Sequence, residues 1–266
     1  MDQVLLTTKS ADGTEIAYET DAAGPPLVMA GGALNGRGSA AVLLPQLADR
    51  FTVVRYDRRG RGDSGDTPPY APEREVEDLE AVIGAVGGPV YAFGHSSGAA
   101  LTLFAARRGA PIRRMALYEP PFLVDDARAP LPADWLERLR AASPAEAVEL
   151  FLTEAVGVPA PMVEQMKAGP MWPGLAAIGH TVLYDNTIMW PYQQGKPLPR
   201  EWAYEVGSTP TLVIDGGRSP AWMRNAAAAT ADLLPGAQAL TLADCDHGAP
   251  PEVIGPVLSD FFGGGQ

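Results

Sequence analysis

The chain has 266 residues, of which 46% are hydrophobic and 20% are charged, and its formal net charge is −12. This length suits one large domain, and the composition is typical of a folded protein, which excludes a disordered or fibrous one. Because only 20 Lys and Arg residues stand against 32 Asp and Glu residues, the surface is unsuited to a nucleic-acid backbone. We therefore expect a small-molecule substrate and no nucleic-acid partner.

The first residues lack a basic segment followed by an apolar run, and no apolar stretch reaches the roughly 18 residues that cross a bilayer. We therefore expect a cytoplasmic protein without membrane contact. One cysteine and three widely separated histidines indicate neither a disulfide framework nor a zinc cluster, so no metal and no cofactor are expected. The sequence leaves open whether the chain forms a homodimer.

Short apolar runs alternate with helical patterns along the chain, which is typical of βαβ units and a mainly parallel sheet. The sequence therefore predicts an α/β fold with an eight-stranded, mostly parallel sheet flanked by helices. Strands are expected at residues 4–8, 15–19, 26–30, 51–56, 89–93, 114–118, 209–214 and 237–242. Helices are expected at residues 40–48, 74–86, 97–107, 220–233 and 251–262.

One interval interrupts this alternation. Between residues 119 and 208 no strand-like run occurs, and helical patterns recur at about residues 133–142, 144–156, 160–167 and 175–189. The second of these opens with Ser143-Pro144-Ala145-Glu146, which predicts a capping box. We interpret residues 120–207 as a helical lid over the C-terminal ends of the strands, inserted into a core domain formed by residues 1–119 and 208–266.

The segment Gly94-His95-Ser96-Ser97-Gly98 follows a strand-like run and precedes a helical pattern. In this strand–turn–helix setting a G-x-S-x-G sequence presents a nucleophilic serine, and its two glycines let strand and helix approach each other. Ser96 is therefore the predicted nucleophile. The predicted oxyanion hole consists of the N–H of Ser97, at a helix start, and that of Gly32, in the glycine pair after the third strand.

A group of Met and Trp residues in the predicted lid bears on the substrate. Such soft and aromatic side chains can line an adaptable apolar pocket, or they can simply hold the lid onto the core domain. If they line a pocket, the substrate is a small, largely hydrophobic ester, lactone or thioester. The expected substrate-binding residues are Met162, Met166, Trp172, Met189 and Trp190.

Four segments together resemble the α/β-hydrolase fold, over essentially the whole chain: AGGAL at 30–34, YDRRGRGDSG at 56–65, GHSSG at 94–98 and DHGAPPEV at 246–253. In that fold the nucleophile follows the fifth strand, a lid lies between strands six and seven, and the catalytic histidine follows the eighth. The resemblance therefore implies that His247 is the general base and that His95 is a supporting residue. The arginine-rich part of the second segment has no phosphate-cradling spacing, so we expect a structural loop packed by ion pairs.

The catalytic acid departs from the usual pattern of this fold. Its members usually place an aspartate shortly after the seventh strand, where this sequence has Ser219, and a serine cannot hold an imidazolium by charge. Some members carry the acid just after the sixth strand instead, and Glu119 lies there, twenty-three residues after Ser96. We favour Glu119 as the acid, and Asp215 is the alternative.

The resemblance implies a serine hydrolase in which Ser96 attacks an acyl carbon, His247 transfers the proton and Glu119 orients His247. Two alternatives stay open, since a fold does not fix its chemistry. One is a non-hydrolytic enzyme of the same fold, which would be a lyase, a cyclase or a perhydrolase. The other is a ligand-binding receptor that makes little use of the triad.

Overall fold

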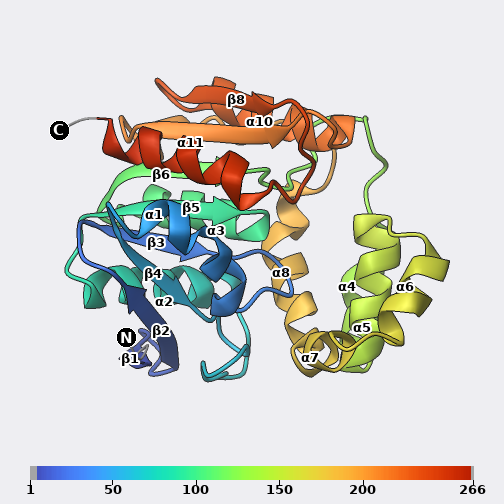
Figure 1. The fold of residues 1–266 in the computed structure, drawn as a ribbon. Coiled ribbons are helices and arrows are strands. Elements are labelled where there is room, and N and C mark those ends of the chain that lie inside the picture. The colour runs from blue at the N-terminus through green and yellow to red at the C-terminus, as the bar shows by residue number, and fades with distance from the viewer. Residues whose placement is uncertain (1–4, 265–266) are drawn as a thin grey trace.

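An eight-stranded sheet runs through the computed structural model, which describes residues 5–264 (Figure 1). Its strand order is β1-β2-β4-β3-β5-β6-β7-β8; β2 is antiparallel to both neighbours, and the other pairs are parallel. This confirms the predicted fold class. The first predicted strand begins at Val4, which lies outside the described residues. The strands are β1 (Leu6–Lys9), β2 (Glu15–Asp21), β3 (Pro26–Ala30), β4 (Thr52–Tyr56), β5 (Val90–His95), β6 (Ile112–Tyr118), β7 (Thr211–Gly216) and β8 (Gln238–Leu242).

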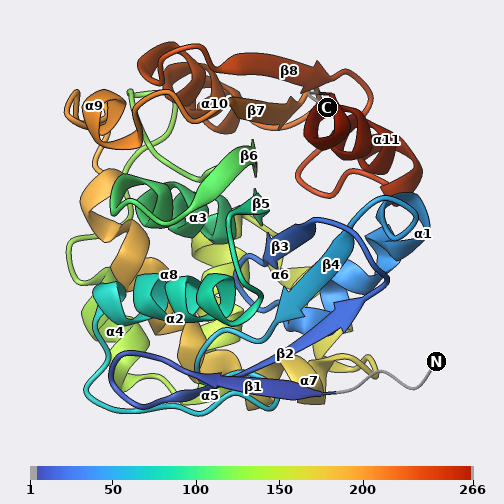
Figure 2. The ribbon, with the colours of Figure 1, turned by 90° about the vertical axis from the view of Figure 1, so that its left-hand side faces the viewer.

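Helices cover both faces of the sheet because the central strands bury apolar side chains on both sides. In β3, for example, Val28 packs into the core on one face, while Leu27 and Met29 pack into the core on the other. Figure 2 shows α2 and α3 on one side of the sheet and α1 and α11 on the other. The helices that flank the sheet are α1 (Leu44–Leu47), α2 (Pro72–Ala85), α3 (Ser97–Arg107), α10 (Ala221–Leu233) and α11 (Pro251–Gly263).

Further helices lie between β6 and β7, and we refer to them as the insertion helices. In Figure 1 the arrowheads of the parallel strands point toward them, and α8 lies between α4 to α7 and the sheet. Helices α4 to α8 share an apolar cluster that includes Trp135, Val148 and Val182, whereas Trp202 of α9 packs into the core of the sheet. That they act as a lid stays a prediction. The insertion helices are α4 (Trp135–Ala141), α5 (Pro144–Leu150), α6 (Ala160–Lys167), α7 (Trp172–Ala177), α8 (Val182–Met189) and α9 (Trp202–Val206).

The insertion departs from the sequence prediction in three places. The helix expected at 144–156 is α5 followed by the π-helical segment Phe151–Val156. The helix expected at 175–189 is divided into α7 and α8 by the 3-10 turn Gly179–Thr181. At this break Gly179 packs so closely on α5 that a Cβ atom would lie 2.6 Å from the carbonyl carbon of Pro144. The short α9 was not predicted, because five residues carry too little periodicity to be recognised.

Two other expectations for helices can be compared with the structure. The helix expected at 40–48 is a 3-10 helix (Arg37–Leu43) followed by the single turn α1. The predicted capping box at the start of α5 is confirmed, since Glu146 N donates to Ser143 Oγ and Ser143 N donates to the Glu146 carboxylate. Within residues 5–264 no helix is both long and apolar enough to cross a membrane.

Candidate active site

Ser96 occupies a sharp turn between β5 and α3. Its φ of 58° and ψ of −127° are strained for a residue with a side chain. The turn is held by the sheet, because Ser96 N donates to the carbonyl oxygen of Tyr118 at 2.9 Å, just beyond the end of β5. The backbone therefore presents Ser96 at the C-terminal edge of the sheet, where parallel α/β proteins bind their ligands.

The two glycines around Ser96 are required by close packing. A Cβ atom at Gly94 would lie 2.5 Å from the Cα of Ala99, and one at Gly98 would lie 2.7 Å from the carbonyl carbon of Ala30. Both distances are far shorter than any real Cβ contact. The prediction that these positions must be small so that strand and helix can approach is therefore confirmed.

His247 lies in the loop after β8, and its Nδ1 is 2.6 Å from Oε2 of Glu119. Glu119 is fully buried and also accepts a hydrogen bond from Gly216 N at 2.8 Å. Burial by itself raises the pKa of the Glu119 carboxyl, but its hydrogen bonds, led by the one from His247, bring the pKa below its ordinary value. Because an ionised carboxylate only accepts, Nδ1 of His247 carries the proton and Nε2 is left as an acceptor.

The alternative acid, Asp215, is occupied elsewhere. It lies on β7, where Thr241 Oγ1 of the neighbouring strand donates to Asp215 Oδ1 at 2.8 Å. Thr241 lies directly opposite Asp215 in the register of β7 and β8. This contact therefore joins the edge strand β8 to β7. The structure thus brings Glu119, and not Asp215, to His247.

The main chain of Gly32 lies against the side chain of Ser96. A Cβ atom at Gly32 would be 2.9 Å from the Cβ of Ser96 and 3.4 Å from its Oγ. Ser97 is the first residue of α3, where the leading amides of a helix have no carbonyl partner within it. Both predicted oxyanion donors therefore belong to main chain next to the Ser96 hydroxyl.

Behind these two main-chain segments lies a buried ion cluster formed by Arg58, Arg61, Glu75 and Asp185. Arg58 Nη1 lies 2.6 Å from Asp185 Oδ1 and Arg58 Nε lies 2.5 Å from Glu75 Oε2, while Arg61 pairs with the other oxygen of Asp185. Burial raises the pKa of the Asp185 carboxyl, but the two guanidinium groups outweigh burial and lower it. The arginine-rich loop is thus packed by ion pairs, as predicted.

The ion cluster also holds both predicted oxyanion donors. Ser97 Oγ donates to Asp185 Oδ1 at 2.5 Å. Arg58 Nη1 donates to the carbonyl oxygen of Gly31 at 3.3 Å, and this carbonyl belongs to the same planar peptide unit as the N–H of Gly32. Because the carbonyl and N–H of a trans peptide point in opposite directions, fixing the Gly31 oxygen sets the direction of the Gly32 N–H. Asp185 lies on α8, so an insertion helix takes part in this arrangement.

A cavity of about 670 Å³, the large cavity, opens between the sheet edge and the insertion helices. Ser96 and His247 both line it, so the predicted nucleophile and base face one space. Of the expected substrate-binding residues, Met166 and Met189 also line it.

The other expected substrate-binding residues, Met162, Trp172 and Trp190, do not line the large cavity, and this expectation is corrected here. Met162, in the first turn of α6, is 54% exposed. Trp172 and Trp190 pack against the apolar cluster of the insertion.

Sequence reasoning missed Arg128, Trp222 and Met223, which do line the large cavity. The two last residues follow Pro220 at the start of α10, directly after β7. Their place beyond the C-terminal end of a parallel strand was a usable signal.

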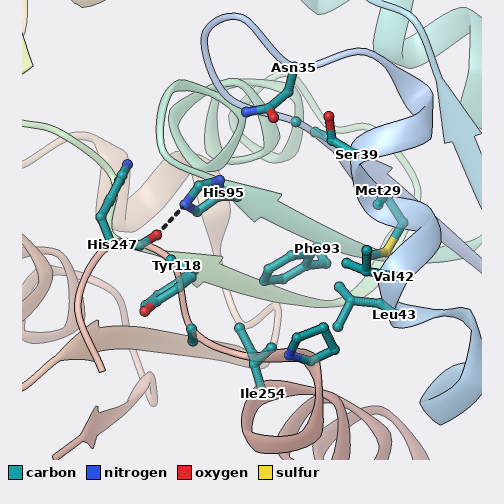
Figure 3. Close-up of a pocket in the computed structure, with 16 residues that line it drawn as sticks. Met29, Asn35, Ser39, Val42, Leu43, Phe93, His95, Tyr118, His247 and Ile254 are labelled. Atoms are coloured by element: carbon teal, nitrogen blue, oxygen red, sulfur yellow. Dashed lines mark hydrogen bonds between the residues drawn. The ribbon is translucent and has the colours of Figure 1, made fainter. Parts of the chain in front are cut away.

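A second space of about 220 Å³, the small cavity, lies on another side of His95 (Figure 3). Figure 3 shows Phe93, Tyr118 and Ile254 along its apolar wall. His95 Nε2 lies 2.8 Å from the carbonyl oxygen of His247. Burial and the neighbouring His247 lower the pKa of His95 to about 4, so it is neutral near pH 7 and Nε2–H donates this bond. His95 thereby supports the main chain that carries His247.

A family model described as the alpha/beta hydrolase family matches residues 27–253. A crystal structure of an alpha/beta hydrolase from Sphaerobacter thermophilus is 50% identical, covers 97% of this chain and 100% of that one, and superposes with a TM-score of 0.89. The enol-lactonase of Burkholderia xenovorans is similar in fold alone, at 21% identity over 96% of this chain and 99% of that one, with a TM-score of 0.72.

A shorter match is to a protein of Mycobacterium tuberculosis named "Probable oxidoreductase EphD", which is 35% identical over 103 residues. Those residues are 36% of this chain and only 17% of that protein, so the chain spans a small part of this relative. The family model, by contrast, extends from β3 to the first turn of α11. It therefore covers the turn at Ser96 and the insertion helices. The chain belongs to the alpha/beta hydrolase family.

Proposed function

We propose that this protein is a serine hydrolase that cleaves an ester, lactone or thioester bond of a small, largely hydrophobic substrate through an acyl-enzyme. One observation carries the proposal. The strained Ser96 and His247 line a single cavity, and Nδ1 of His247 lies 2.6 Å from the buried carboxylate of Glu119. Nucleophile, acid and base thus come from segments that follow β5, β6 and β8 at one edge of the sheet.

The reaction follows from the protonation states. With its Nδ1–H donated to Glu119, His247 accepts the Ser96 proton at Nε2 as Ser96 Oγ bonds to the acyl carbon. The carbonyl oxygen becomes negative and faces the N–H groups of Gly32 and Ser97. As this intermediate collapses, the bond to the leaving group breaks and His247 returns the proton to it. A water molecule then attacks the acyl-enzyme by the same sequence and releases the acid.

The lining of the large cavity supports an apolar acyl compound. Leu131, Phe151 and Met189 are among its walls, and soft or aromatic side chains of this kind favour an apolar substrate body. The likeness to an enol-lactonase is in keeping with ester or lactone chemistry. The insertion helices would serve as the lid that separates this cavity from water.

Labelling with a fluorophosphonate tests the nucleophile. We expect one covalent adduct per chain, mapped by mass spectrometry to Ser96, and hydrolysis of members of a p-nitrophenyl ester and lactone panel. The Ser96→Ala variant should keep its thermal midpoint and lose both labelling and turnover. An adduct at another residue, or unchanged hydrolysis by Ser96→Ala, would overturn the proposal. Labelled protein that turns over no ester or lactone would favour a non-hydrolytic reaction or ligand binding instead.

A further inference from the structure

Arg128 is a charged residue of the large cavity wall, in the segment between β6 and α4. Its guanidinium lies between two other parts of that wall. Arg128 Nη2 donates to the carbonyl oxygen of Glu154 at 2.9 Å, and its Cζ is 5.0 Å from the centre of the Trp222 ring. Trp222 lines the large cavity, and so do the residues that follow Glu154. The charged end of Arg128 is therefore at the cavity wall.

The positive charge of Arg128 has no carboxylate to balance it among residues 5–264. Its protein contacts are a neutral carbonyl and the face of an aromatic ring, and burial lowers its pKa without a carboxylate to raise it again. Arg58 and Arg61, the two arginines that bind Asp185, differ in this respect, since the carboxylates of the ion cluster balance their charges. A half-buried guanidinium of this kind is stabilised by an anion with two oxygens.

The acidic groups that line the large cavity do not fill this role. Asp185 is bound by Arg58 and Arg61, and Asp246 Oδ1 accepts from Gly248 N at 3.0 Å. The formal net charge of −12 also gives the chain no general attraction for anions, so an anionic ligand needs a specific cation. Arg128 supplies that cation in the cavity that contains Ser96.

We propose that Arg128 binds a carboxylate of the substrate, so that the preferred substrate is an acyl compound with an apolar body and an anionic end remote from the scissile bond. This inference rests on the proposed hydrolase function and narrows its substrate class. The guanidinium would hold the carboxylate by paired N–H···O bonds while the acyl carbon lies at Ser96. The Trp222 ring, whose centre lies 5.0 Å from Arg128 Cζ, would help to hold the guanidinium in place.

The test compares two matched substrate series. One consists of p-nitrophenyl half-esters of dicarboxylic acids from adipate to sebacate, and the other has the free carboxylate replaced by the isosteric primary amide. We expect the native protein to prefer the carboxylate over the amide by about 10- to 100-fold in kcat/KM at the best chain length, mainly through KM, which is the range for hydrogen bonds to a charged group. The chain length with the highest preference measures the span from Ser96 to Arg128.

Two variants show whether Arg128 is responsible. In Arg128→Gln the carboxylate preference should fall by about tenfold or more, and Arg128→Lys should keep part of it, because the charge stays but the fork is lost. The matched control is Arg140→Gln, which removes the same charge from an exposed position on α4 outside both cavities and should leave the preference unchanged. An equal rate for both series in the native protein, or a preference retained by Arg128→Gln, would refute the inference.

Binding gives a readout that is independent of turnover. In the Ser96→Ala background, calorimetric titration with the half-ester should show affinity that falls about tenfold when Arg128→Gln is added. If the protein hydrolyses both series at equal rates, the role of Arg128 is refuted and the proposed hydrolase function is not. Absence of hydrolysis of both series would refute the proposed function, and the titration would still decide whether Arg128 binds a carboxylate.

Discussion

Replacement of Glu119 by glutamine tests the least usual feature of the site. The change keeps the shape of the side chain and an oxygen that can accept from Gly216, but it removes the charge next to His247. In the native protein Oε2 accepts from Nδ1 at 2.6 Å in a fully buried environment. An amide NH₂ in that place would instead donate to Nδ1, which moves the imidazole proton to Nε2, the nitrogen that must accept from Ser96.

The size of the effect follows from these contacts. Loss of one charge-assisted hydrogen bond is worth about 1.5–3 kcal/mol, which alone lowers the rate by roughly 10- to 150-fold. Reversal of the tautomer in a comparable triad costs about 10⁴-fold in kcat, or about 5.5 kcal/mol of transition-state stabilisation. We therefore expect Glu119→Gln to lose at least about a hundredfold in kcat.

The matched control is Asp215→Asn, the same acid-to-amide change on the adjacent strand. Because Asp215 contacts Thr241 and not His247, its kcat on a p-nitrophenyl ester should fall by less than about tenfold. Thermal midpoints are measured for both variants, since Glu119 also anchors the Gly216 main chain. If both variants keep their midpoints and Asp215→Asn is the inactive one, the assignment of the acid is wrong.

Two further predictions concern buried charge. Asp185→Asn leaves Arg58 and Arg61 with a single buried counter-ion. The free energy of unfolding, measured in urea, should therefore fall by about 3 kcal/mol, and kcat should drop about tenfold or more. An unchanged kcat in a folded variant would contradict the role of the ion cluster. The pKa of His95 is about 4 when folded, against an ordinary 6.5. The unfolded chain binds this proton more tightly, so on the order of 3 kcal/mol of stability is present above pH 6.5 and is lost as the pH falls toward 4. His95→Asn should flatten this pH dependence of the unfolding free energy, and an unaltered slope would refute the assignment.

Local sequence patterns were sufficient to predict the sheet and the sharp turn at Ser96. The central strands are short apolar runs bounded by turn residues, and the close packing at Gly94 and Gly98 leaves a signature within five residues of sequence. Glu119 could be favoured through the resemblance to the α/β-hydrolase fold, some members of which carry the acid after the sixth strand. Each of these inferences needs only the neighbours of a residue along the chain or the order of the strands.

Inferences that depend on how elements pack could not be made in this way. Met162 and Met166 lie one helical turn apart on α6, yet Met166 lines the large cavity and Met162 is exposed. Residues four apart lie on the same face of a helix, so periodicity cannot separate these two, and only the packing of α6 shows which turn reaches the cavity. The contact between Arg58 and Asp185 joins residues that are 127 positions apart, and nothing local marks Asp185 as the partner. The charge imbalance at Arg128 is likewise visible only when its surroundings are known.

The ion cluster anchors α8 of the insertion to α2 and to the loop after β4. Withdrawal of α8 from the sheet would separate the Asp185 carboxylate from the two guanidinium groups. Buried charges would then lose their partners, which costs several kcal/mol of free energy. The stacked rings of Tyr70 and Tyr184, 3.9 Å apart, fasten the same helix a second time. If the insertion acts as the proposed lid, an opening that keeps the ion cluster intact leaves α8 in place. The helix that contacts the Gly32 and Ser97 segments would then stay still, and the two proposed oxyanion amides would keep their geometry while a substrate enters and a product leaves.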